Sequence, residues 1–162
     1  MHDPHVDIPI EFADPAHEAL MNIWWTGTLL KRTARRFFKD TSFTDAEFNL
    51  LIVLRHSDVP LSQNDLSERL LVDKSNVTGL IDRLQKAGLI RRNAVPDDRR
   101  RYHITLTDAG REEIDRVDPV YHAMVHRVMD RLADDEYRIL VGLTRKVRQG
   151  LQESALDLPT GR

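Results

Sequence analysis

The 162-residue sequence contains no cysteine. Structural disulfides, thiolate metal sites and thiol-based sensing of peroxide are therefore excluded. Long apolar runs are also missing, and the most apolar stretch, LLIVL at residues 50–54, is far shorter than a transmembrane helix. The first residues are acidic and lack the apolar segment of a secretory signal. We therefore expect a cytoplasmic protein without a membrane partner.

The sequence also lacks the patterns that usually carry catalysis. We find no nucleophile motif, no Gly-rich phosphate loop and no complete set of metal ligands, so an enzyme is the least favoured function and no cofactor is expected. His122 and His126 have a spacing that could hold zinc on one helix face, but Ala123 replaces the glutamate of the metalloprotease pattern. Further ligands such as His17 or Glu18 would be needed. Two surface or interface histidines are the simpler interpretation, and zinc sensing stays open as an alternative.

Neither sign of charge dominates the chain as a whole. Its 24 basic and 26 acidic residues give a net charge of −2, which by itself argues against a nucleic-acid partner. The distribution reverses that inference, because residues 74–111 hold 9 basic and 4 acidic side chains and the remainder holds 15 and 22. A basic segment on an acidic body is typical of a DNA-binding protein. A solvated charged hairpin is the alternative.

Residues 61–88 predict two consecutive helices. Ser62 can cap the first helix with Asp65 in the third position of a capping box, and Leu61 and Leu66 have the spacing of a hydrophobic staple. We expect Asp73 to cap the second helix. Apolar residues at i, i+3, i+4 and i+7 predict one buried stripe along that helix. These residues are Val77, Leu80, Ile81 and Leu84.

The other face of the second helix carries small, polar and basic residues that can bind phosphates or base edges. They are Lys74, Ser75, Asn76, Thr78, Gly79 and Arg83. Asn76 could pair with adenine, and Arg83 could bind guanine or phosphate. Gly79 costs the helix about 1 kcal/mol relative to alanine, which the close approach of another surface would explain. Gly88 ends the helix at the position where a left-handed residue is favoured.

After Gly88 the apolar period changes to two. Leu89 and Ile90 begin one strand, and residues 101–106 alternate between polar and apolar in a second strand. A turn separates the strands at Pro96, Asp97 and Asp98. Its basic tip consists of Arg99, Arg100 and Arg101. Two helices followed by a basic β-hairpin predict a winged helix, with the second helix in a major groove and the wing in the adjacent minor groove.

Residues 72–110 resemble the core of the MarR family of bacterial transcriptional regulators. The matching runs are VTGLIDRLQKAGLIRR, DDRR and LTDAG. Asp98 and Arg100 match the Asp-x-Arg motif of the family's wing, and Leu106 and Thr107 follow at the family's distance. We expect Asp98 to support the wing by holding Arg100, while Arg99 and Arg101 contact the DNA backbone. The flanking helices match the family only in length and apolar spacing.

Helical spacing precedes the winged helix. Asp14 followed by Pro15 predicts a helix that continues to about residue 39. Thr44 and Glu47 form a complete capping box for a second helix, which reaches about residue 55. The expected staple of that helix consists of Phe43 and Phe48.

Two further helices are predicted after the hairpin. Thr107 and Asp108 begin the first of them, and Pro119 predicts a kink or break near Asp118. We expect the last helix to run from about Asp134, which takes the place of the family's usual serine cap, to about residue 153.

The expected fold is mainly α with a small β-hairpin wing, in one MarR-like domain over residues 1–162. Residues 44–106 form the winged helix-turn-helix. Residues 14–40 and 107–156 carry apolar stripes that the winged helix does not need. Intramolecular packing could cover these stripes, but the resemblance favours N- and C-terminal dimerisation helices.

Aromatic residues offer a possible ligand pocket. Trp24, Trp25 and Phe48 could line a space between the dimer helices and the winged helix. Members of the family often bind small phenolic or aromatic acids there. At helical spacing aromatic residues are more often core, and we expect this for Trp24, whereas Trp25 lies off the main apolar stripe.

Together these features predict a homodimeric transcriptional regulator that binds a palindromic operator in double-stranded DNA. The resemblance implies a repressor that blocks polymerase and responds to a small aromatic effector. Two alternatives stay open: a metal-sensing repressor that uses His122 and His126, and a winged-helix module that binds protein instead of DNA. The arginine cluster of the wing argues against the second alternative.

Overall fold

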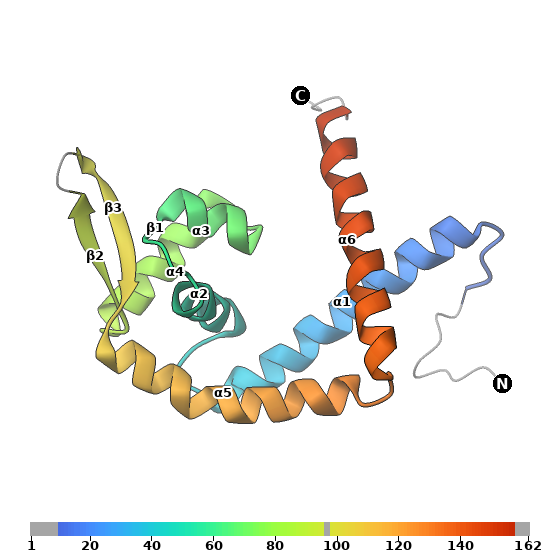
Figure 1. The fold of residues 1–162 in the computed structure, drawn as a ribbon, viewed down its shortest axis with the longest axis horizontal. Coiled ribbons are helices and arrows are strands. Elements are labelled where there is room, and N and C mark those ends of the chain that lie inside the picture. The colour runs from blue at the N-terminus through green and yellow to red at the C-terminus, as the bar shows by residue number, and fades with distance from the viewer. Residues whose placement is uncertain (1–9, 96–97, 158–162) are drawn as a thin grey trace. The chain divides into compact units, whose positions relative to one another are not determined.

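The computed structural model describes residues 10–95 and 98–157, with side chains described for 10–95 and 102–154. The chain forms α1 (Pro15–Phe37), the short 3₁₀ helix η1 (Phe38–Asp40), α2 (Asp45–Arg55), β1 (Leu61–Ser62), α3 (Gln63–Leu70), α4 (Lys74–Lys86), β2 (Ile90–Val95), β3 (Asp98–Leu106), α5 (Asp108–Met129) and α6 (Asp134–Asp157) (Figure 1). It divides into two compact units, one up to Val117 and one from Asp118. The predicted fold class, mainly helical with a small winged sheet, is confirmed.

Local capping signals determine where α2 and α3 begin. The Thr44 backbone N–H donates to Glu47 Oε2 at 2.8 Å, and the Glu47 N–H donates to Thr44 Oγ1 at 3.3 Å. Ser62 and Asp65 form the same reciprocal pair at 2.7 and 3.3 Å. Both predicted capping boxes are confirmed, and each satisfies backbone donors that the helix leaves unpaired.

The sheet is larger than the sequence pattern indicated. The predicted hairpin is present, with Ile90 opposite Leu106, but its strand β3 also pairs with β1, giving the antiparallel order β1-β3-β2. In β1, Leu61 lies opposite Ile104. A two-residue strand has no readable period, so the pattern could not reveal it. Of the predicted turn residues, Pro96 and Asp97 lie outside the described residues, and Asp98 begins β3.

The core of the first unit lies between α2, α3, α4, the sheet and the start of α5. The predicted stripe of α4 is entirely buried, which confirms its orientation. Apolar residues from every surrounding element complete this core. They include Phe48, Leu50, Leu51, Leu61, Leu66, Ile90, Ile104, Leu106, Ile114 and Val117.

The LTDAG run forms a tight junction between the wing and α5. Thr107 Oγ1 donates to the Gly88 carbonyl at 2.7 Å and accepts from the Gly110 N–H at 3.0 Å. The Thr107 N–H donates to the Leu89 carbonyl at 3.1 Å. Gly88 has the predicted left-handed backbone, with φ of 75°. A Cβ on Gly110 would lie only 2.1 Å from the Leu89 oxygen, so this contact requires glycine.

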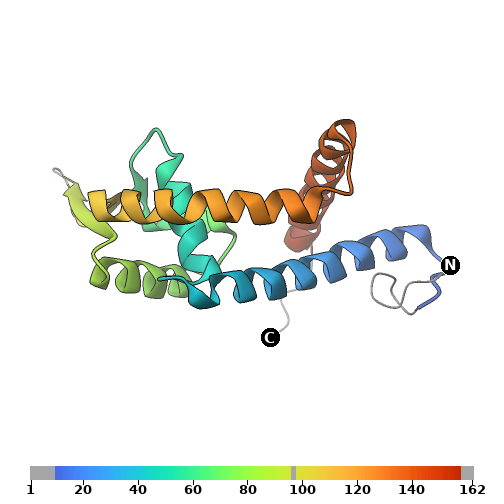
Figure 2. The same cartoon turned by 90° about the horizontal axis from the view of Figure 1, so that it is seen from below.

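Two expectations about the last helices need correction. Of the kink or break expected near Asp118, the break is absent, because α5 continues through Pro119 as one helix (Figure 2). Proline removes one backbone donor, and a long helix can continue on both sides of that gap. Asp134 is the first residue of α6 and not its cap. Ala133 takes the cap position instead, since its N–H donates to Glu136 Oε2 at 2.7 Å. None of the helices in the described ranges is long and apolar enough to cross a membrane.

Candidate nucleic-acid interface

The first turn of α4 presents an exposed polar surface. Lys74, Ser75 and Asn76 are exposed, while the next residue, Val77, is fully buried. Asp73 has the extended backbone of an N-cap, but its side chain makes no capping hydrogen bond within the described part of the chain. The prediction that Asp73 caps the helix is therefore wrong for its side chain. Backbone N–H groups at such a helix start can bind an anion.

Thr78 and Gly79 lie half-buried behind this first turn. The side chain of Gln63, the first residue of α3, donates to Thr78 Oγ1 at 2.6 Å, and Thr78 Oγ1 donates to the Lys74 carbonyl at 2.9 Å. Thr78 thus links the two helices of the helix-turn-helix. A Cβ on Gly79 would lie 3.4 Å from Arg83 Nη1. Within the chain this is an ordinary contact, so the close approach of another surface to Gly79 stays a prediction.

Arg83 is bound to the protein through one edge of its guanidinium. Its Nε donates to Glu47 Oε1 at 2.6 Å, and the Arg83 side chain remains 60% exposed while that of Glu47 is 9% exposed. Burial acts to raise the pKa of Glu47. Hydrogen bonds from the Thr44 backbone, from Arg83 and from the Thr44 hydroxyl outweigh it, so the pKa lies below its ordinary value of 4.5. Glu47 is therefore an anion at neutral pH.

A second ion pair connects α4 to the base of the wing. Arg92 of β2 donates through Nη2 to Asp82 Oδ1 and through Nη1 to Gln85 Oε1, both at 2.5 Å. Farther along the wing, the backbone of Asp98 and of Arg99, Arg100 and Arg101 belongs to β3. Their side chains lie outside the described residues, so the expected support of Arg100 by Asp98 stays a prediction.

The sequence and the fold agree with one family. A model of the MarR family matches residues 41–101. The HTH-type transcriptional regulator YkoM of Bacillus subtilis (strain 168) is 32% identical over 108 residues, which cover 67% of this chain and 70% of YkoM. This chain belongs to the MarR family. As a MarR-family protein it is a DNA-binding transcriptional regulator, and the proteins it resembles are regulators and not enzymes.

Solved structures of DNA-binding proteins share its fold. Sco3205 from Streptomyces coelicolor, a MarR family transcriptional regulator solved in complex with DNA, superposes with a TM-score of 0.77 and 28% identity over 90% of this chain and 94% of Sco3205. Bordetella bronchiseptica BpsR, whose DNA binding is regulated by 6-hydroxynicotinic acid, superposes with a TM-score of 0.63 and 28% identity over 76% of this chain and 98% of BpsR.

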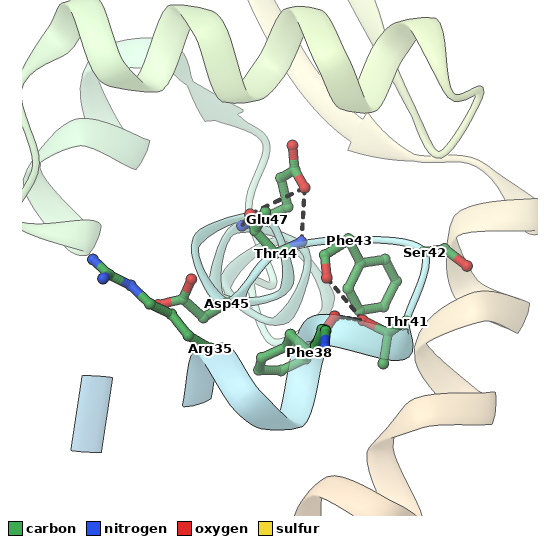
Figure 3. Close-up of a pocket in the computed structure, with 9 residues that line it drawn as sticks. Arg35, Phe38, Thr41, Ser42, Phe43, Thr44, Asp45 and Glu47 are labelled. Carbon is green, nitrogen blue, oxygen red and sulfur yellow. Dashed lines mark hydrogen bonds between the residues drawn. The ribbon is translucent and has the colours of Figure 1, made fainter. Parts of the chain in front are cut away.

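A pocket of about 340 Å³ lies where α1 leads through η1 into α2 (Figure 3). Arg35 and Asp45 lie on one side of the view, and Thr41 and Ser42 lie on the other. The complete lining comprises Arg35, Phe38, Lys39, Thr41, Ser42, Phe43, Thr44, Asp45 and Glu47. The pocket thus combines two cationic side chains, two carboxylates, two aromatic rings and several hydroxyl groups.

The aromatic residues that the sequence suggested for a pocket between the dimer helices and the winged helix are not part of this one. Phe48 is fully buried, with its ring stacked on Phe43 at a centroid distance of 5.7 Å. Trp24 is 72% exposed and Trp25 is 43% exposed. The expectation that Trp24 belongs to the core of the chain is wrong, because within the described residues α1 buries none of its side chains. None of these three residues lines the pocket described above.

The two histidines of α5 are exposed side chains. His122 Nε2 lies 3.5 Å from Asp118 Oδ1. Within residues 10–95 and 98–157 no three histidine, aspartate or glutamate side chains are arranged to hold a metal ion. The zinc alternative therefore gains no support from the geometry.

Sequence patterns did not reveal the residues that hold α4 in place. Glu47 was identified as a helix cap, but its partner Arg83 lies 36 residues away. Gln63 and Arg92 carried no signal beyond their polarity. Such contacts between separate elements follow from the tertiary fold and not from local spacing.

Proposed function

We propose that this MarR-family regulator acts as a homodimeric repressor on a palindromic operator. Each protomer inserts α4 into a major groove and its wing into the adjacent minor groove. The observation that carries this proposal is the exposed first turn of α4 beside an entirely buried stripe. The burial orients the helix so that its polar N-terminal residues are available to DNA.

The proposed DNA-binding residues have different roles, which follow from the chemistry of their side chains. Asn76 offers an amide that can pair with adenine on a base edge. Lys74 and Ser75, beside the uncapped N–H groups of the first turn, suit phosphate oxygens. Arg99, Arg100 and Arg101 are assigned to the minor groove and its flanking phosphates, with Asp98 orienting Arg100. Thr78 and Gly79 support this surface from behind.

Dimerisation is supported by the terminal helices, each considered by itself. Among the described residues, α1 has no buried side chain, and its exposed apolar residues include Leu20, Ile23, Trp24 and Leu30. Helix α6 exposes Ile139, Leu140, Leu143 and Leu151. Apolar surface of this extent is stabilised by burial at about 25 cal/mol per Å². A second copy of the chain would supply that burial.

The proposed effector is a small aromatic acid. Arg35 and Lys39 can bind a carboxylate, and Phe38 and Phe43 can contact an aromatic ring. The regulation of BpsR by 6-hydroxynicotinic acid supports this ligand class. Such a ligand relieves repression only if it binds the conformation that is incompatible with DNA more tightly, since equal affinity would shift nothing.

Selection of bound sequences from random DNA will identify the operator and test its palindromic form. Titration of that operator and of random duplex then tests the assignment of α4. Asn76→Ala is expected to cost about 1–3 kcal/mol on the operator and little on random DNA. The matched control is Asn49→Ala, which changes an exposed asparagine of α2. Equal behaviour of the two variants would refute the reading role of α4.

The effector is tested by adding salicylate or 6-hydroxynicotinic acid to the operator complex. We expect both acids to weaken operator binding, and Arg35→Ala to reduce that effect. Arg36→Ala is the control, because Arg36 is an exposed neighbour that does not line the pocket within the described part of the chain. If Trp25→Ala abolishes the response and Arg35→Ala does not, the effector occupies the site suggested by the tryptophans instead.

A further inference from the structure

Two adjacent residues of α4 form ion pairs with two different elements. Asp82 pairs with Arg92 of β2, and Arg83 pairs with Glu47 of α2. Consecutive residues of a helix point about 100° apart, so these pairs constrain α4 from two directions. The pair between Asp82 and Arg92 lies on the surface, with Asp82 58% exposed, and contributes little. The pair between Arg83 and Glu47 is different because Glu47 is buried.

The Glu47 carboxylate is held by its own helix cap as well as by Arg83. Its Oε2 accepts the Thr44 backbone N–H at 2.8 Å and the Thr44 hydroxyl at 3.0 Å. This leaves Oε1 to accept from Arg83 Nε at 2.6 Å. An acceptor fixed by its own helix cap fixes the position of its donor in turn. Gly79 leaves the guanidinium unobstructed, and even a Cβ there would make only an ordinary contact at 3.4 Å from Arg83 Nη1.

We propose that Arg83 is a positioning residue of the DNA-binding surface, which sets the orientation of α4 through Glu47 and does not itself read the DNA. This inference rests on the proposed function of α4 as the recognition helix. It replaces the sequence-based expectation that Arg83 binds guanine or phosphate. The ion pair connects α4 to the start of α2, where the lining of the pocket also includes Glu47.

The two possible roles of Arg83 predict opposite effects when Glu47 is neutralised. Glu47→Gln removes one negative charge from the protein, and charge alone would then strengthen binding to every DNA sequence. If Arg83 positions α4, the same change weakens operator binding, because the ionic anchor of the arginine is lost. Glutamine is an accepted residue at the third position of a capping box, so the start of α2 is retained.

The experiment titrates the selected operator and random duplex at several salt concentrations with the full chain. Arg83→Ala and Glu47→Gln are each expected to weaken operator binding roughly tenfold, and the double variant is expected to be no weaker than either single variant. Lys86→Ala, which removes an exposed cation from the same helix, corrects for the general loss of one positive charge. Arg83→Lys should recover part of the operator affinity.

Three results would overturn the proposal. The first is a result typical of a phosphate contact. Arg83→Ala would then lower the slope of log affinity against log salt concentration by about one unit more than Lys86→Ala does, and Glu47→Gln would bind as tightly as the parent. In another, the losses in operator affinity caused by Arg83→Ala and by Glu47→Gln add up in the double variant. In the third, stoichiometric titration shows a smaller active fraction with an unchanged operator-to-random ratio, which indicates loss of folded protein only.

The Asn76→Ala variant is measured in parallel to separate this inference from the proposed function. If Asn76→Ala leaves operator binding unchanged, α4 is not the recognition helix and both proposals fail. If Asn76→Ala weakens operator binding and Glu47→Gln does not, α4 reads the DNA and only the positioning role of Arg83 is refuted.

Discussion

Glu47 performs two structural tasks with one carboxylate. One oxygen caps α2 through Thr44, and the other holds Arg83 of α4. A buried charge is costly unless it is fully paired, and here three donors offset the burial. The ionised form is therefore the one that the folded state stabilises.

The lowered pKa of Glu47 predicts a pH-dependent stability. Because the folded pKa lies below the ordinary value of 4.5, the stabilising contribution is fully present above that value and is lost as the pH falls through the folded pKa. At pH 7 we expect Glu47→Gln to be less stable than the parent by about 1–3 kcal/mol, with the difference shrinking in acid. Urea unfolding between about pH 7 and pH 3 measures it, with Glu68→Gln on exposed Glu68 as the control. If the stability difference between Glu47→Gln and the parent did not change with pH, the stabilising role of the Glu47 anion would be contradicted.

Leu71 occupies an unusual backbone conformation in the turn between α3 and α4. Its φ of 53° and ψ of 44° are left-handed, and its side chain is 71% exposed. Residues other than glycine pay roughly 1–2 kcal/mol for this conformation. We expect Leu71→Gly to increase the free energy of unfolding by about 0.5–1 kcal/mol, because the relief of strain exceeds the added freedom of the unfolded chain. Urea denaturation provides the measurement, and a loss of stability would show that the leucine side chain makes a stabilising contact.

At the scale of elements, the sequence predicted what short-range chemistry determines. The capping boxes of α2 and α3 and the buried stripe of α4 depend on residues within a few positions of one another. The pairing of β1 with β3 joins Leu61 to Ile104 and leaves no local signal. At Ala133 the expectation failed because the side-chain carboxylate of Glu136 accepts the Ala133 backbone N–H, without help from the cap residue's own side chain. The orientation of α4 was therefore predictable, while its ion pair between Arg83 and Glu47 was not.

The junction between the wing and α5 gives a prediction at the same scale. In Gly110→Ala the new methyl group would meet the Leu89 carbonyl oxygen, which is backbone and cannot move independently of β2. We expect a loss of at least about 2–3 kcal/mol in the free energy of unfolding. Gly150→Ala is the control, because a Cβ there meets nothing within 4 Å in the described structure and alanine favours a helix by up to about 1 kcal/mol. Chemical denaturation measures the free energy of unfolding of both variants, and equal stability of the two would contradict the proposed clash.

At the scale of the whole molecule, the terminal helices α1 and α6 are largely exposed in the single chain. Helix α1 is 23 residues long and α6 is 24 residues long, yet neither buries a side chain among the residues whose side chains are described. A palindrome also requires two copies of α4, related by the same two-fold symmetry as the DNA. One homodimer would meet both requirements at once.

A single apolar position on α6 tests this homodimer. Leu143 shares a helical face with Leu140, Val147 and Leu151, whereas Val141 projects from the opposite side of the helix. Both are about equally exposed in the single chain, at 55% for Leu143 and 52% for Val141. We expect the parent to have twice the chain mass of 18.8 kDa by light scattering at micromolar concentration, and Leu143→Glu to shift it towards the monomer. Val141→Glu should leave the mass unchanged.

Loss of the dimer should also weaken binding to the operator. A dimer contacts two half-sites about 34–36 Å apart at the same time, which raises its affinity for the palindrome. A monomer loses that gain in affinity. Leu143→Glu should therefore lower affinity for the palindrome far more than affinity for an isolated half-site, because α4 itself is unchanged. Titration of both duplexes with both variants measures this difference. A monomeric Leu143→Glu protein that binds the palindrome as tightly as the parent would show that the terminal helices serve another purpose.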